Sequence, residues 1–289
     1  MTKEIYIIIA CVPLYVINSF CDKIVSSKEQ NRYNYFYNAV KFLICSICML
    51  PMILFDKVPV FAVGSLLCGT FCGIMYAISK VVMLKGYEKT SVAFMTLCHS
   101  SGMILPCIIG HFFWSEKMNA MSVLGMILAI LSIVLLKGGN GADKKFNFNG
   151  AIFGIIVFLT SAGVMIAQKL MGIYFSEQSI SAYNFYSFVV PFLIISCFVR
   201  PKKLVGEEKK NKLPVFVCAL GSAVSLCIIS FVMTSLSGRV PSVLLFPLFN
   251  GLGIIFVCIG SVFAFKEKLT AKKLTGLALG VIGLCLVNL

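Results

Sequence analysis

Apolar stretches long enough to cross a lipid bilayer recur along this chain, with short polar segments between them. A helix needs about 20 mostly apolar residues to span the hydrocarbon core, whereas a strand of a membrane barrel needs about ten alternating residues. The stretch lengths therefore predict an all-α integral membrane protein with ten transmembrane helices. The expected spans are 5–24, 34–55, 58–81, 91–113, 119–137, 150–172, 181–199, 214–235, 240–263 and 271–288.

The second half of the chain repeats the first. A shift of 151 positions aligns the 90–136 segment with the 241–287 segment without a gap, and a shift of 150 aligns the segment from Tyr33 with that from Tyr183. Generic hydrophobicity does not readily place Glu-Lys and Gly matches at one register. The matches include Ser91, Gly102, Cys107, Glu116, Lys117 and Gly125 with Ser242, Gly253, Cys258, Glu267, Lys268 and Gly276.

Each copy of this repeat holds five of the expected spans. Because five is odd, the second copy must enter the membrane from the opposite face, which makes an inverted repeat. Inverted repeats are typical of transporters whose substrate site lies near the midplane between the halves. The predicted domains are a first five-helix repeat at 1–138, a linker at 139–149 and a second five-helix repeat at 150–289.

Composition places most of the protein surface in lipid. Of 289 residues, 59% are hydrophobic and 12% are charged, and the mean hydropathy is +0.97. Soluble domains carry about 45–50% apolar and about 25% charged residues. We therefore expect a multi-pass protein of the cell membrane, with the lipid bilayer as its solvent. The net charge of +14 comes from loop lysines, which act as orientation signals, so no nucleic-acid partner is expected.

The ends of the two repeats resemble a known family. Each has an acidic residue in a short turn, Glu116 or Glu267, followed by a glycine in the next helix, Gly125 or Gly276. These features, within a likeness that covers nearly the whole chain, resemble the ten-helix EamA-type members of the drug/metabolite transporter superfamily. The family pattern usually has glycine before the glutamate, and Ser115 and Lys266 depart from it.

This resemblance implies a transport activity without naming its substrate. Similar proteins move amino acids, metabolites, nucleotide sugars or drugs. Small multidrug-resistance relatives carry a membrane-embedded glutamate in their first helix for proton coupling, whereas the nearest acid here is Asp22, close to the end of the first span.

The predicted function is alternating-access transport of a small organic solute by a monomer without a cofactor. The alternatives are a membrane-embedded enzyme and a structural membrane protein. An enzyme needs a nucleophile–base pair or clustered metal ligands. His99 and His111 lie on one span with no carboxylate inside the membrane, so we expect no enzyme.

Polar side chains deep in the spans are the candidate substrate-binding residues, because such groups usually face a cavity or a partner. His99 and Asn250 are equivalent under the 151 shift and predict a pair near the midplane; interhelical hydrogen bonding is the alternative role. Lys41 could bind an anionic group or could extend to the interface, and Lys23 and Lys169 are expected to extend there. The candidates are His99, Asn250, Ser79, Ser230, Asn18, Tyr76 and Lys41.

Small residues predict where helices approach closely. We expect the last helices of the two repeats to pack through Gly125, Ala129, Gly276 and Gly280. Gly69 and Gly73 form a similar pair, for which packing is the main interpretation.

Orientation follows from the distribution of Lys and Arg. The connections after the odd-numbered spans carry most of them, including the clusters at 200–212 and 266–273. Because short basic loops stay in the cytoplasm, this bias predicts that both termini are outside. The family resemblance implies the reverse, with both termini in the cytoplasm. We favour the charge bias.

Overall fold

The computed structural model describes residues 2–25, 34–56, 61–89, 92–137, 148–199, 212–265 and 271–287. Within these ranges the chain is helical and contains no strand. Seven segments are long and apolar enough to cross a membrane, and three shorter apolar helices accompany them. The expected all-α membrane architecture is thus confirmed for the described residues.

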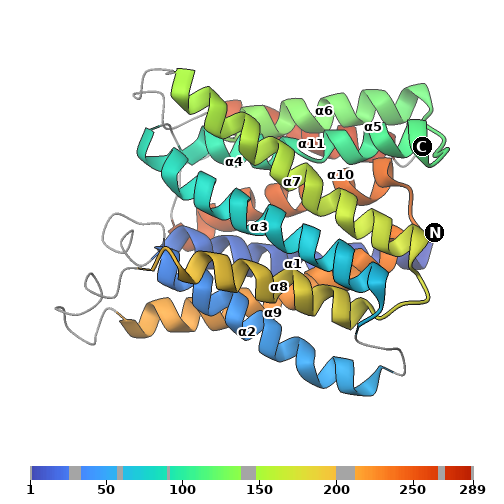
Figure 1. Ribbon diagram of the computed structural model, residues 1–289. Helices are drawn as coiled ribbons and strands as arrows, with labels where there is room; N and C mark the ends of the chain where they lie inside the picture. The colour runs from blue at the N-terminus through green and yellow to red at the C-terminus, as the bar shows by residue number, and fades with distance from the viewer. Residues whose placement is uncertain are drawn as a thin grey trace.

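The helices form an elongated bundle (Figure 1). The helices of the first half are α1 (Thr2–Val25), α2 (Asn34–Phe55), α3 (Val63–Lys89), α4 (Val92–Ser101), α5 (Ile104–Phe113) and α6 (Ala120–Lys137). Those of the second half are α7 (Phe148–Tyr174), α8 (Ile180–Ser196), α9 (Lys212–Ser237), α10 (Ser242–Phe265) and α11 (Ala271–Val287). Both chain ends lie at one end of the bundle, here called the terminal end, and α1 finishes at the opposite end.

One expected helix is broken in two. The sequence predicts a continuous helix over 91–113, but α4 ends at Ser101 and α5 begins at Ile104. Gly102 approaches the backbone of α7 closely, and the Ser161 hydroxyl of α7 donates to the His99 carbonyl at 2.7 Å. That hydrogen bond satisfies an acceptor at the break, as backbone groups at membrane depth require.

Another helix is longer than expected. The sequence predicts a span over 58–81, whereas α3 covers Val63–Lys89. The residues after 81 include Met, Leu, Lys and Glu, which are good helix formers, so the helix continues beyond the apolar stretch.

The last helices of the two halves, α6 and α11, share the most extensive contact among the described helices. A Cβ at Gly283 would lie 2.8 Å from the Gly125 carbonyl oxygen, and the Ser132 hydroxyl donates to the Gly276 carbonyl at 2.6 Å. The repeat shift of 151 positions makes Gly125 equivalent to Gly276 and Ser132 equivalent to Gly283. Each of these two contacts is therefore the repeat equivalent of the other. The contacts also make α6 and α11 antiparallel, the geometry of a two-fold axis across the bundle.

The predicted small-residue packing is confirmed. A Cβ at Gly280 would lie 2.6 Å from the Ser132 hydroxyl, and a Cβ at Gly283 would lie 2.9 Å from the Ala129 nitrogen. Gly69 and Gly73 likewise let α3 approach the backbone of α8, where a Cβ at Gly69 would lie 2.6 Å from the Tyr183 carbonyl oxygen.

Gly283→Ala should destabilise the protein by about 1–3 kcal/mol, because the added methyl group meets rigid backbone on α6. Gly221→Ala is the matched control, since its Cβ would meet Cys21 Sγ at 3.8 Å, an ordinary contact. Thermal unfolding in detergent should show a lower transition temperature for the first variant alone. Equal transition temperatures for the two variants would mean that α6 and α11 accommodate the added methyl group without loss of stability.

Candidate functional site

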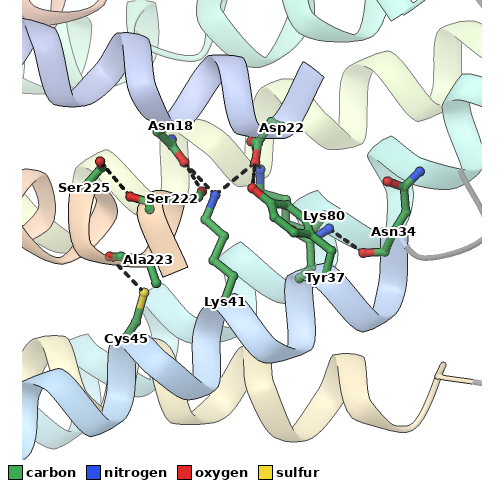
Figure 2. Close-up of polar contacts among 12 residues, drawn as sticks. Asn18, Asp22, Asn34, Tyr37, Lys41, Cys45, Lys80, Ser222, Ala223 and Ser225 are labelled. Atoms are coloured by element: carbon green, nitrogen blue, oxygen red, sulfur yellow. Dashed lines mark hydrogen bonds and ion pairs between the residues drawn. The ribbon is translucent and has the colours of Figure 1, made fainter. Parts of the chain in front are cut away.

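A cluster of polar side chains lies between α1, α2, α3 and α9, and we call it the Lys41 cluster (Figure 2). The Lys41 ammonium donates to Asn18 Oδ1 at 2.7 Å and to Asp22 Oδ1 at 3.2 Å. The other Asp22 oxygen lies 3.6 Å from the Lys80 ammonium. The members of the Lys41 cluster are Asn18, Asp22, Tyr37, Lys41, Lys80 and Ser222.

Helical spacing explains how two elements of the cluster meet. Asn18 and Asp22 are four residues apart on α1, and Tyr37 and Lys41 are four residues apart on α2, so each pair shares one face of its helix. The Tyr37 hydroxyl donates to Asp22 Oδ1 at 2.6 Å. The two faces therefore meet through three side-chain contacts in successive turns.

The second half of the chain completes the cluster. The Ser222 hydroxyl of α9 donates to Asn18 Oδ1 at 2.6 Å. One turn further along α2, Cys45 contacts the Ala223 carbonyl of α9. The Lys41 cluster thus lies at the interface between the two repeats, where the site of an inverted-repeat transporter is expected.

Burial is uneven within this cluster. The Lys41 side chain is 1% exposed, whereas those of Lys80 and Asp22 are 21% and 32% exposed. Lys41 therefore does not extend to the interface, the alternative considered from the sequence. Its ammonium is held inside by Asn18 and Asp22.

A second charged network lies at the terminal end, and we call it the Glu116 network. The Lys169 ammonium of α7 lies 2.6 Å from Glu116 Oε1 and donates to the Val240 carbonyl at 2.7 Å. Glu116 Oε2 accepts the backbone N–H of Ser242, at the start of α10, at 2.7 Å. A carboxylate is favourable there because the start of a helix carries partial positive charge.

The prediction that Lys169 extends to the membrane interface is wrong. Its side chain is 3% exposed and that of Glu116 is 10% exposed. The buried Glu116 carboxylate holds the Lys169 ammonium group inside. If Lys169 extended to the interface instead, that carboxylate would lose its counter-charge. Glu116 and Lys169 both line a pocket of about 450 Å³, together with Phe113, Trp114 and Arg239.

Hydroxyl and amide groups occupy the interior between α3, α8 and α9. The Ser230 hydroxyl donates to Asn184 Oδ1 at 2.6 Å. Tyr76 packs between Phe42 and Phe188, with ring centroids 5.9 and 6.5 Å away. Ser79, the repeat equivalent of Ser230, is buried without a hydrogen-bond partner among the described residues.

His99 and Asn250 are engaged differently. The Asn250 side chain donates to the Phe246 carbonyl of its own helix at 2.9 Å, while the His99 backbone carbonyl accepts from Ser161. Asn250 is buried and His99 is partly exposed. Their role as facing cavity residues stays a prediction.

Of the seven predicted residues, the structure brings Asn18 and Lys41 into one cluster and places Ser230, Tyr76 and Ser79 in the interior. Sequence reasoning missed several partners of Lys41 and Lys169. The four-residue spacing on the first two spans was a usable signal for Asp22 and Tyr37. No group of three His, Cys, Asp or Glu side chains that could hold a metal ion occurs among the residues that the structure describes.

These observations define a class. The protein is a multi-pass helical membrane protein whose two related halves bury charged groups between them, as transport proteins do. The chain belongs to the EamA-like transporter family, which matches residues 2–137 and again residues 148–289. The chain is thus a member of a family of membrane transporters, and the family points away from an enzyme.

Two further comparisons agree with this assignment. The uncharacterized transporter YxxF of Bacillus subtilis (strain 168) is 30% identical over 101 residues, which are 35% of this chain and 32% of that protein. The matched part thus spans about a third of that relative. A protein of known crystal structure aligns with a TM-score of 0.79 over 99% of this chain and 96% of its own, at 14% identity, and supports the fold alone.

Proposed function

We propose that the protein moves a small organic solute by alternating access between two inverted five-helix repeats, as a monomer that crosses the membrane ten times. The repeats are residues 1–138 and 150–289, joined by 139–149. The antiparallel, reciprocal contact of α6 with α11 supports the inversion. The path would be lined by His99, Asn250, Ser79, Ser230, Asn18, Tyr76 and Lys41.

The observation that carries the proposal is a difference between the two ends of the bundle. At the terminal end, Glu116 and Lys169 are paired and nearly inaccessible. Toward the opposite end, Asp22 and Lys80 are paired loosely and remain partly exposed. Charged groups that are buried at one end of the bundle and partly exposed toward the other are expected of one state of an alternating-access cycle.

Counterflow in proteoliposomes tests this mechanism. Vesicles loaded with an unlabelled solute should take up the same labelled solute faster and to a higher transient level than unloaded vesicles. A panel of labelled amino acids and organic acids would serve as probes. A channel would equilibrate the label without stimulation from inside, and that result across the panel would contradict alternating access.

His99→Ala and Asn250→Ala should each lower transport severalfold at normal expression, because both positions lie at mid-depth in equivalent helices. Ser196→Ala is a suitable control, since the Ser196 hydroxyl bonds its own helix at the Phe192 carbonyl. Initial uptake rates in proteoliposomes measure the effect. Unchanged rates in both alanine variants would remove these residues from the path.

The proposed orientation places both termini outside the cytoplasm, because most Lys and Arg residues follow the odd-numbered predicted spans in the sequence. A C-terminal fluorescent protein that folds only in the cytoplasm should therefore stay dark, while a periplasmic enzyme reporter at the same position should be active. A bright fusion would show that the termini lie in the cytoplasm, and the proposed transport would be unaffected.

A further inference from the structure

We propose that the Lys41 cluster binds an anionic group of the solute, such as a carboxylate or a phosphate, with Lys80 as its direct ligand. This inference rests on the transport function proposed above and names the substrate class of that site. It starts from the charges of the cluster, where two ammonium groups, those of Lys41 and Lys80, contact one carboxylate, that of Asp22.

The excess positive charge is costly in this environment. Ionised side chains inside a membrane protein are expensive unless they are paired or face a water-filled cavity. Asp22 already accepts hydrogen bonds from Tyr37 and Lys41 on one of its oxygens. Among the side chains that the structure describes, it is the acid in contact with both lysines, so an incoming anion would complete the charge balance.

The two lysines are suited to different tasks. Lys41 is almost fully buried and is fixed by Asn18, whose amide oxygen is itself held by the Ser222 hydroxyl. Lys80 lies 3.6 Å from Asp22, beyond normal hydrogen-bond distance, and its side chain is partly exposed. Lys80 can therefore turn to a solute anion, while Lys41 keeps the Asp22 carboxylate in place.

The position of Lys80 along its helix fits a solute site. The apolar stretch of α3 ends near residue 81, and the helix continues for two more turns to Lys89. Lys80 therefore lies near the end of the membrane-spanning part of α3, where a solute entering from the end opposite the termini would meet it. Ser222 of α9 reaches the same cluster from the second repeat, so movement of one repeat against the other would change the environment of a bound anion.

Matched pairs of anionic and neutral solutes test the proposal. The probes are acetate with acetamide, benzoate with benzamide, succinate with succinamide, and inorganic phosphate, each at millimolar concentration. The readout is the thermal unfolding of the purified full-length protein. At least one anion should raise the transition temperature of the wild type, while its neutral amide should not.

Substitutions at Lys80 give the decisive comparison. Lys80→Gln should raise the anion concentration needed for half-maximal protection about tenfold, whereas Lys80→Arg should retain protection because it keeps the charge. Lys85→Gln is the matched control, since Lys85 is an exposed lysine on the same helix that lies over the Phe198 ring. Lys80→Gln leaves Asp22 paired with Lys41, so folding should not suffer.

Three results would overturn the inference: protection by the amides equal to that by the acids, protection unchanged in Lys80→Gln, or no protection by any anion of the panel. Counterflow separates these results from a failure of the transport proposal. If a neutral or cationic solute shows counterflow while the anions fail, transport stands and the substrate class is wrong. If no solute shows counterflow, the transport proposal itself is contradicted.

Discussion

Glu116→Gln should loosen the terminal end of the bundle and slow transport by about tenfold or more. The substitution removes the partner of Lys169, whose side chain is 3% exposed. Breaking a buried ion pair from one side costs about 3–5 kcal/mol, because the remaining charge stays buried. If the free energy that favours the closed over the open state fell by only about 1.4 kcal/mol, the ratio of the two populations would already change tenfold.

A double-mutant comparison isolates the pair. Lys169→Met alone should also destabilise the protein, because the Glu116 carboxylate then loses its buried counter-charge. The double variant Glu116→Gln with Lys169→Met removes both charges, so it should unfold at a higher temperature than either single variant. Strictly additive losses would mean that the two groups stabilise the terminal end independently.

Chemical labelling of a native cysteine can measure how often the terminal end opens. Cys107 is fully buried and its thiol donates to the carbonyl of Ser242, the same residue whose N–H binds Glu116. Its modification by a maleimide, located by peptide mass spectrometry, should be faster in Glu116→Gln than in the wild type. Cys72, equally buried on α3, should react at the same rate in both proteins. If neither Cys107 labelling nor transport changes, the Glu116 network does not close this end.

Hydrophobic length and internal repetition were sufficient to predict most of the fold. Lipid-facing stretches must be apolar over a fixed length, so their spacing along the chain is visible in the sequence. Close helix approach requires small side chains, which is why Gly125, Ala129 and Gly280 predicted the contact of α6 with α11. The interruption at Gly102 escaped prediction, because it depends on the approach of α7 and on the Ser161 hydroxyl.

The candidate site was less accessible from sequence. Lys41 and Asn18 were recognisable as polar groups in apolar stretches, but their partners depend on how the helices are placed. Glu116 reads as a turn residue, yet the fold brings it to Lys169 and to the start of α10. A lysine near the end of a span has the same local sequence whether it extends to water or meets a buried acid.

Asp22→Asn should be the most damaging single change in the Lys41 cluster. Among the side chains that the structure describes, it leaves the ammonium groups of Lys41 and Lys80 without a contacting carboxylate, and the Lys41 side chain is only 1% exposed. We expect a loss of about 3–5 kcal/mol in stability, from the buried Lys41 charge. Glu177→Gln is the control for removal of an acid, because Glu177 is exposed at the terminal end.

Charge balance predicts an order among the variants of this cluster. Lys41→Met leaves Asp22 with Lys80 and Tyr37 as partners, so it should be milder than Asp22→Asn. Adding Lys41→Met to Asp22→Asn returns the cluster to the net charge of the wild type, and the double variant should unfold at a higher temperature than Asp22→Asn alone. Thermal unfolding of the purified variants in one detergent measures the order. If Asp22→Asn unfolds at the same temperature as the wild type, Asp22 is not the counter-charge that holds Lys41 inside. The assignment of Lys80 as the lysine available to an anion then loses its basis.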